Sequence, residues 1–173
     1  MNHYKLFLPV QAVGASLVYF DLFVPTTTQH RIDVLSVRPI VSGAVAVTGV
    51  VAADLHLTRT TAVGTGGTAA TFEGTALDAA TITAIDSQQP LTAKEITARL
   101  TPTGGATAGA WLGYRSLFSE ETNAGTYTPH DLIDVRSRGI FVKPGTGLRV
   151  VQGAVASVGN VGFDILFSVE PRT

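Results

Sequence analysis

The sequence contains no cysteine, which excludes disulfide bonds, thiolate metal sites and thiol nucleophiles. It is also poor in charge, because only 14% of its 173 residues are charged, against about 25% in an average soluble domain. The 12 basic and 13 acidic residues give a net charge of -1, and no stretch concentrates lysine or arginine. The chain therefore lacks the basic surface on which nucleic-acid binding depends. A surface with few charges suits a protein that neighbours cover in an assembly.

Long hydrophobic runs are missing as well. No apolar stretch reaches the roughly 18 residues that a membrane-spanning helix needs, so we expect no membrane partner. The apolar segment that follows Lys5 is short and is interrupted by Pro9 and Gln11, and we interpret it as mature protein rather than as a leader. Amphipathic helical spacing is almost absent, which excludes a helical bundle.

What the sequence does have is typical of an all-β protein. Threonine, alanine, valine and glycine dominate, and 18 glycines and 8 prolines punctuate the whole length. β-Branched residues favour the pleated backbone, and short apolar runs between turn residues indicate strands. The pattern predicts about eight strands and leaves 76–89 as a loop. The candidate strand segments are 16–24, 31–37, 45–61, 69–72, 95–101, 110–119, 140–142, 147–155 and 161–169. Pro39 is expected to close the second of these, the long third run is expected to bend or bulge near Gly49, and 95–101 could be one helical turn instead of a strand.

This pattern predicts an antiparallel β-sandwich that is jelly-roll-like, with an immunoglobulin-like sandwich as the nearest competitor. No internal repeat or second core is visible, so residues 15–173 are expected to form a single domain. Residues 1–14 look less committed to that domain. We interpret them as an extended N-terminal arm that reaches a neighbouring subunit by adding a strand to its sheet.

Three stretches carry a resemblance to a known class of proteins. They are LTRTTAVGTGGTA at 57–69, AWLGYRS at 110–116, and the C-terminal region 147–170 with its GLRVVQG and GFDILFSVE segments. In this order they resemble small β-rich virion proteins of tailed bacteriophages, over about residues 30–170. The class includes capsid decoration (cement) proteins, which commonly sit as trimers on the head lattice. A tail or fibre component would look similar.

The resemblance implies a structural protein on the surface of the phage head. Such a protein stabilises the shell by binding the major capsid protein lattice, associates with itself as a homotrimer, and is not an enzyme. The alternative is a tail or fibre component that acts as a host-surface or carbohydrate-binding module. For the docking surface we combine apolar residues of the arm with three arginines, since the planar guanidinium binds carboxylates bidentately. The candidate interface residues are Tyr4, Leu6, Phe7, Leu8, Arg136, Arg138 and Arg149.

A metal or cofactor site is not expected. None of the four histidines pairs with another at ligand spacing. The closest polar pair is Asp54 with His56, which share one face of a strand. A metal could use that face only if a third ligand came from elsewhere, so we favour a solvated strand face or an intersubunit hydrogen bond.

Two further motifs have an ordinary structural explanation. Residues 64–67 are rich in glycine, but no Lys-Ser/Thr pair follows them, so they predict a turn and not a phosphate loop. A group of carboxylates in and beside a polar loop could bind calcium or, less readily, cleave glycosides. We favour a solvated loop for this group, which consists of Glu120, Glu121, Asp131 and Asp134.

The aromatic residues of the 110–119 strand raise the question of a sugar-binding face. Trp111, Tyr114 and Phe118 could line one, because aromatic rings stack well on apolar ligand surfaces. In a regular strand, however, Trp111 and Tyr114 point to opposite faces. We therefore expect these residues to belong to the core, with one of them anchoring an interface.

Overall fold

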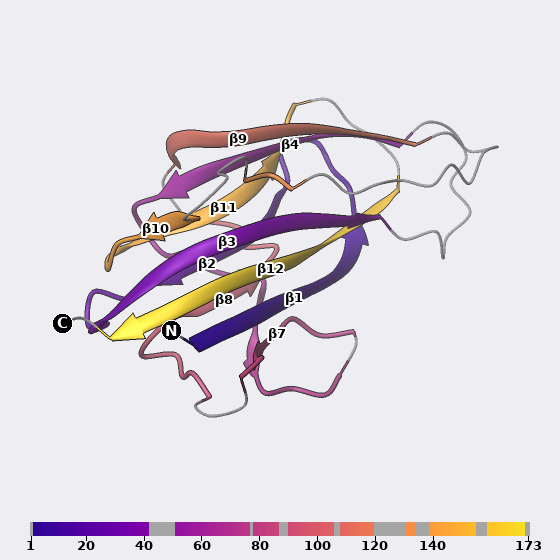
Figure 1. The fold of residues 1–173 in the computed structure, drawn as a ribbon. Coiled ribbons are helices and arrows are strands. Elements are labelled where there is room, and N and C mark those ends of the chain that lie inside the picture. Colours follow the sequence, from indigo (N-terminus) through magenta and orange to yellow (C-terminus); the bar gives the residue numbers. More distant parts are fainter. Residues whose placement is uncertain are drawn as a thin grey trace.

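The computed structural model describes residues 2–41, 51–76, 78–86, 90–105, 108–119, 131–133, 139–154 and 159–171. In these ranges no helix is long and apolar enough to cross a membrane. The regular elements are strands (Figure 1). They are β1 (Asn2–Ala12), β2 (Val18–Val24), β3 (His30–Val41), β4 (Val51–Thr60), β5 (Thr68–Ala69), β6 (Thr71–Phe72), β7 (Thr81–Ala84), β8 (Thr97–Leu100), β9 (Ala108–Ser119), β10 (Ile140–Val142), β11 (Thr146–Gln152) and β12 (Asn160–Pro171).

The strands form two six-stranded sheets. Sheet A has the order β10-β3-β12-β1-β7-β6, and sheet B has the order β5-β8-β2-β11-β4-β9. All pairs between these strands are antiparallel except β6 with β7. Figure 1 shows β3, β12 and β1 of sheet A lying over the strands of sheet B. The predicted all-β sandwich is confirmed.

The connections of the main strands follow a regular scheme. Without the four short strands β5 to β8, the orders are β10-β3-β12-β1 and β2-β11-β4-β9. Along the chain, β1, β3, β10 and β12 belong to sheet A, whereas β2, β4, β9 and β11 belong to sheet B. We interpret this order as that of a jelly roll, which is built from eight strands in two Greek keys.

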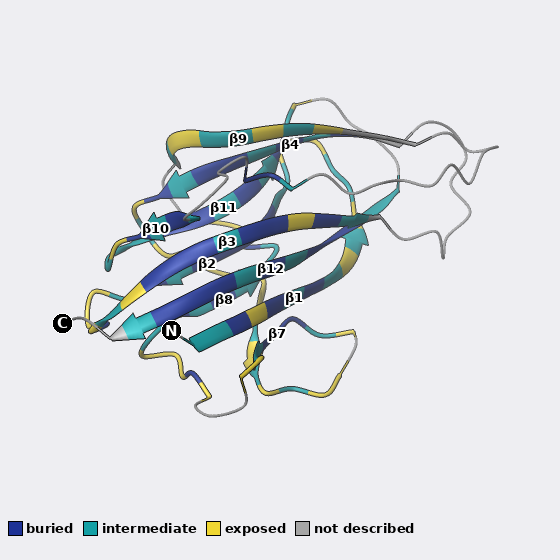
Figure 2. Cartoon of the chain, in the orientation of Figure 1, coloured by how far each residue is buried: buried dark blue, intermediate teal, exposed yellow. Residues whose placement is uncertain are grey.

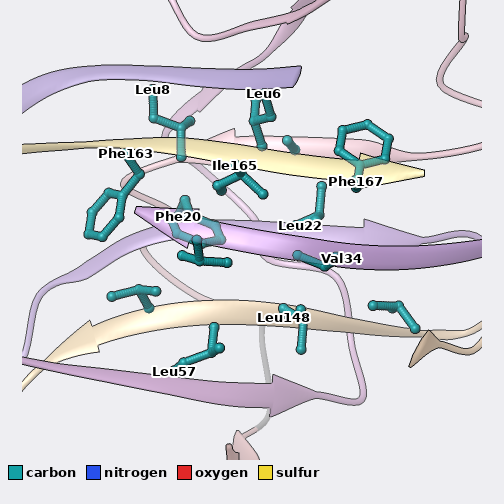
Figure 3. Close-up of a cluster of buried hydrophobic side chains, with 14 of the residues drawn as sticks. Leu6, Leu8, Phe20, Leu22, Val34, Leu57, Leu148, Phe163, Ile165 and Phe167 are labelled. Atoms are coloured by element: carbon teal, nitrogen blue, oxygen red, sulfur yellow. The ribbon is translucent and has the colours of Figure 1, made fainter. Parts of the chain in front are cut away.

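The core lies between the two sheets and follows from period-two alternation. The largest side chains of the inner faces meet there (Figure 3). Phe163 of sheet A packs against Phe20 and Tyr19 of sheet B, with ring centroids 5.3 and 5.4 Å apart. Each such side chain contributes about 1.5–3 kcal/mol through burial. Figure 2 shows how buried positions recur along the strands of both sheets.

The expected N-terminal arm is wrong. Residues 2–12 form β1, which lies inside sheet A between β12 and β7. Tyr4, Leu6 and Leu8 are buried in the core, with exposed fractions of 2%, 0% and 0%. Their alternation is the ordinary pattern of a half-buried strand. The segment does add a strand to a sheet, but the sheet is its own.

Two prolines lie inside strands rather than at their ends. Pro39 was expected to close its strand, yet β3 continues to Val41 and pairs Pro39 with Phe163. The other neighbour of β3, the short β10, pairs only with the 32–34 end of β3. Pro39 therefore lies where β3 has an edge, a place that tolerates proline. Pro9 lies at the register shift between Leu8 and Gln11, and an irregularity of this kind also tolerates proline.

The middle of the chain is more ordered than expected. The 76–89 segment contains the strand β7, and the ambiguous 95–101 segment contains β8. The 69–72 candidate is divided between β5 and β6, which belong to different sheets. The long 45–61 run contains β4, and the bend expected near Gly49 lies outside the described residues.

Candidate functional site

The outer surface of sheet B carries a group of side chains on the neighbouring strands β9, β4 and β11. On β4, Leu55 and Leu57 are fully buried, so the alternate residues point away from the core. We call this group the aromatic face. It consists of Asp54, His56, Thr58, Trp111, Tyr114, Ser116, Arg149, Val151 and Gly153.

The strand register arranges the aromatic face in rows across the three strands. In the first row Thr58 lies between Trp111 and Arg149, and in the second His56 lies between Tyr114 and Val151. In the third row Asp54 pairs with Ser116 on β9, and its backbone oxygen accepts a hydrogen bond of 2.9 Å from the Gly153 N–H of the residue after β11.

A β-bulge places the two aromatic residues on the same face. Consecutive residues of β4 pair with Gly113 and Trp111, so Leu112 is an extra residue on β9. The extra residue reverses the alternation of side chains. Trp111 and Tyr114, three positions apart, therefore share the outer face, and our expectation that they point to opposite faces is wrong.

The sequence offers one sign of this irregularity. A Cβ on Gly113 would lie 2.2 Å from the carbonyl oxygen of Leu132, so any larger residue would force the backbone to shift. A glycine inside a strand indicates a bulge or a close approach of another backbone. Here both occur together, but the pattern does not show which neighbouring residue is the extra one.

The aromatic side chains are exposed. Trp111, the only tryptophan of the chain, has an exposed fraction of 70%, and that of Tyr114 is 46%. The imidazole of His56 meets both rings edge-on, with centroids 4.5 Å from Trp111 and 5.0 Å from Tyr114. Such edge-to-face contacts hold the three rings in place.

Asp54 is held by hydroxyl groups of β9. Its Oδ1 accepts hydrogen bonds from the Tyr114 hydroxyl at 3.0 Å and from Ser116 Oγ at 2.8 Å. Its Oδ2 faces the space above Gly153, where it lies 3.7 Å from the position of an ideal Cβ. The Nε2 atom of His56 lies 3.4 Å from the same position. Two polar atoms therefore converge where the chain has no side chain.

A surface pocket of about 420 Å³ opens over this part of the face. This volume falls within the range of about 300–1,000 Å³ typical of small-molecule sites. The pocket is lined by Asp54, His56, Thr58, Trp111, Arg149, Val151, Gln152, Gly153 and Ala154. The arrangement is suited to binding an uncharged polar ligand that also has an apolar surface.

Asp21, on the neighbouring strand β2, lies opposite Arg149. Arg149 pairs in register with Asp21 of β2, and its Nε lies 3.3 Å from Thr58 Oγ1. Asp21 is 1% exposed and accepts a hydrogen bond from the backbone N–H of Gly64. Burial raises the pKa of the Asp21 carboxyl, while the Gly64 N–H, Arg149 and Arg99 act in the opposite direction.

The glycine-rich 64–67 segment forms the predicted turn. Gly66 and Gly67 have φ angles of 70° and 62°, which favour glycine. A Cβ on Gly67 would lie 2.2 Å from the Leu100 carbonyl oxygen, so this turn packs closely on the end of β8. The N–H of Gly64 binds Asp21 of the chain itself, which gives the turn a structural role at the edge of the aromatic face.

The outer surface of sheet A has a different chemistry, and we call it the ion-paired face. Its charges pair with one another: Lys5 with Asp164 at 2.8 Å, Arg31 with Asp33 at 2.7 Å, and Arg38 with Asp131 at 3.8 Å. Three apolar residues lie half-buried among these pairs. They are Phe7, Phe141 and Leu166.

The predicted interface residues are dispersed by the fold. Three of them, Tyr4, Leu6 and Leu8, are core residues, because β1 is an internal strand, and they are not available for docking. Phe7 lies on the ion-paired face and Arg149 on the aromatic face, so the structure does not bring them together. The remaining two, Arg136 and Arg138, lie outside the described residues.

The predicted carboxylate group is described only at Asp131. This carboxylate accepts hydrogen bonds from the Val37 N–H at 2.9 Å and the Ile133 N–H at 2.8 Å, and it also binds Ser36. It therefore ties the 131–133 segment to β3. Outside the described residues lie Glu120, Glu121 and Asp134.

Asp54 and His56 share one strand face, as predicted. In the part of the chain that the structure describes, no three His, Asp or Glu side chains are grouped closely enough to hold a metal ion. No protein family, curated protein or solved structure matches the chain.

Proposed function

We propose that the chain is a non-catalytic capsid decoration protein of a tailed bacteriophage. It binds the lattice of the major capsid protein on the head surface and stabilises the shell. The sequence resemblance in 57–69, 110–116 and 147–170 supports this role, and so does the low proportion of charged residues. The sandwich fold is compatible with it, because the long strands of each sheet form a broad outer face.

The observation that carries the proposal is the composition of the ion-paired face. Phe7 and Leu166 are half-buried on neighbouring strands, and the Lys5–Asp164 ion pair lies beside them. Interfaces between proteins that also exist separately combine apolar and polar area in this way. Paired charges contribute little affinity at the rim of an interface, but they select the partner and its orientation.

The mechanism is mechanical. Surface buried between this face and the capsid subunits opposes the outward pressure of the packaged DNA. We propose a homotrimer, because three linked contacts add avidity without stronger single contacts. Light scattering of the purified chain tests this assembly, with a mass of three times 18.0 kDa expected. A monomer at every concentration would contradict the trimer.

Co-sedimentation with phage heads tests the docking face. The heads are assembled from the major capsid protein encoded in the same genome as the chain. Phe7→Ser should weaken binding about tenfold or more, as expected for an apolar anchor of an interface. The matched control is Val63→Ser, an exposed valine beside the 64–67 turn and not on the ion-paired face, and it should bind as the unaltered chain does. Equal binding by the Phe7 variant, or equal losses in both, would contradict the proposed face.

A second candidate function is favoured by the aromatic face. The exposed Trp111 and Tyr114 beside a pocket suit a host-surface binding component of a tail or fibre. The two candidates differ in where the chain attaches. Binding to purified tails, with none to heads in the same sedimentation experiment, would favour this second candidate over the decoration role.

A further inference from the structure

We infer that the aromatic face is a carbohydrate-binding site that holds one pyranose ring against Trp111, with the hydroxyl groups of the sugar above Gly153. The site is separate from the ion-paired face. The inference goes beyond the proposed decoration role and does not depend on it, since a chain attached to a virion through sheet A leaves this surface of sheet B uncovered.

The apolar part of the site is the exposed indole. Trp111 is 70% exposed although it is the largest side chain in the molecule, and its neighbour His56 makes a T-shaped contact with its ring. A tryptophan side chain is rigid, so covering it costs little conformational entropy. The C–H face of a pyranose is flat and apolar, and it can cover an indole while the sugar hydroxyls stay at the edges.

The polar part of the site is arranged before any ligand arrives. The hydroxyls of Tyr114 and Ser116 hold Asp54 through Oδ1, which leaves Oδ2 directed towards the space above Gly153. His56 Nε2 reaches the same space. A sugar hydroxyl can donate to the carboxylate while a neighbouring hydroxyl bonds to the imidazole. Fixed groups of this kind favour binding because little ordering remains to be done.

The charges of the pocket favour a neutral sugar. The charged side chains that line it are Asp54 and Arg149, and Arg149 faces Asp21 on the next strand. The described lining therefore carries one carboxylate and one guanidinium, without the excess of positive charge that attracts a phosphate or a nucleic acid. The ligand that fits is uncharged, rich in hydroxyl groups and apolar on one side, which describes a pyranose of a neutral glycan.

Gly153 provides a selective way to block the site. A Cβ at this position would lie 3.3 Å from Asp54 Cβ and 3.4 Å from His56 Nε2, so alanine would press on the two side chains that are to bind the sugar hydroxyls and would narrow the space between them. Gly153 is not among the described glycines with positive φ, so alanine is compatible with its backbone. The matched control is Gly104→Ala, because the nearest atom there is Thr65 Oγ1 at 3.5 Å, an ordinary contact, and Gly104 does not line the pocket.

The only tryptophan of the chain makes the site directly observable by fluorescence. The purified chain is titrated with maltotetraose, cellotetraose, chitotetraose, yeast mannan and the O-polysaccharide of a Gram-negative bacterium. We expect at least one of these probes to change the Trp111 emission in a saturable way. The absence of a saturable response to all five would overturn the inference.

Variants then locate the binding on a glycan array that carries the same sugars. Gly153→Ala and Trp111→Ala should each weaken binding about tenfold or more, whereas Gly104→Ala should bind as the unaltered chain does. Thermal unfolding checks that each variant is folded. If Trp111→Ala does not fold, Gly153→Ala alone tests whether glycans bind at the aromatic face. Unchanged binding by a folded Gly153→Ala would overturn the inference. The inference would also be overturned if Trp111→Ala abolished binding to phage heads but left binding to every glycan unchanged. That result would assign the face to a protein partner.

Discussion

The outer face of sheet A balances its charges within itself, whereas the outer face of sheet B leaves two aromatic rings exposed beside a pocket. On sheet A, charged residues on facing strands and at alternate positions pair with one another, as Lys5 does with Asp164. On sheet B, Trp111 and Tyr114 come together because an extra residue of β9, Leu112, lies between them. The first face follows from regular alternation, and the second depends on a break in it.

A single bulge is therefore enough to place on one face two side chains that regular alternation would separate. A regular β9 would place Trp111 and Tyr114 on opposite faces, and one of them would be directed inwards. The extra residue turns both rings outwards and leaves His56 between them. Bulges often lie beside binding sites because they redirect side chains in this way.

The largest effect is expected inside sheet A, where neighbouring residues of β1 face opposite sides. Leu6 is fully buried and Phe7 is half-buried on the outer face. Leu6→Ala should lower the free energy of unfolding by about 3 kcal/mol, through lost burial and the cavity left behind. Phe7→Ala should lower it by less than about 1 kcal/mol. Urea unfolding measures both, and equal losses would show that β1 does not separate core from surface.

Removing the bulge should have the next largest effect. Deletion of Leu112 removes the bulge between Trp111 and Tyr114, so Trp111 should turn to the inner side of the strand. We expect a blue shift of the Trp111 emission, loss of its response to sugar, and a destabilisation of about 1–2 kcal/mol. The control Leu112→Ala keeps the residue count and should keep the emission maximum. An unchanged maximum in the deletion variant would contradict the role of the bulge.

The buried carboxyl beside the aromatic face should make stability depend on pH. Burial raises the pKa of Asp21 in the folded chain, so folding favours the protonated form. The stability gained in this way is complete below the unfolded pKa of about 3.9. It is lost as the pH rises through the raised folded pKa.

Asp21→Asn tests this dependence, because asparagine is neutral and still accepts the Gly64 N–H. Its free energy of unfolding, relative to that of the unaltered chain, should increase as the pH is raised from about 4 towards 7. Urea unfolding at several pH values gives this difference, and Asp164→Asn on the ion-paired face is the exposed control. A difference that stays constant over this pH range would contradict the proposed burial of the charge.

The smallest effect is expected from the ion pairs of sheet A. Lys5 and Asp164 have side-chain exposures of 46% and 33%, so water screens their attraction. Lys5→Ala should change the free energy of unfolding by less than about 0.5 kcal/mol. A loss of more than about 1 kcal/mol that high salt abolishes would show that these pairs stabilise the fold.

Alternation alone was enough to predict most of the sandwich. Phe163, Ile165 and Phe167 follow one another at period two, and all three are fully buried in β12. The sequence also contained the pattern of β1, in Tyr4, Leu6 and Leu8, but its position at the terminus suggested an arm. Local pattern identifies a strand without identifying its neighbour, because the pairing of β1 with β12 joins opposite ends of the chain.

The candidate site was harder to predict for a physical reason. Whether Trp111 and Tyr114 share a face depends on the register between β9 and β4, and register is a property of two strands rather than one. Gly113 marked the irregular position, but the close approach of Leu132 that requires it comes from a segment beyond the strand. That Asp54 and His56 share one face could be predicted, since both lie on β4 two positions apart.

We propose that the two outer faces have different partners, sheet A the capsid lattice and sheet B a glycan. A cryo-electron microscopy reconstruction of phage heads incubated with the chain tests this proposal most directly. We expect added density in which Phe7 and the ion-paired face contact the shell and Trp111 points to solvent. The opposite orientation, with Trp111 buried against the shell, or heads without added density, would contradict it.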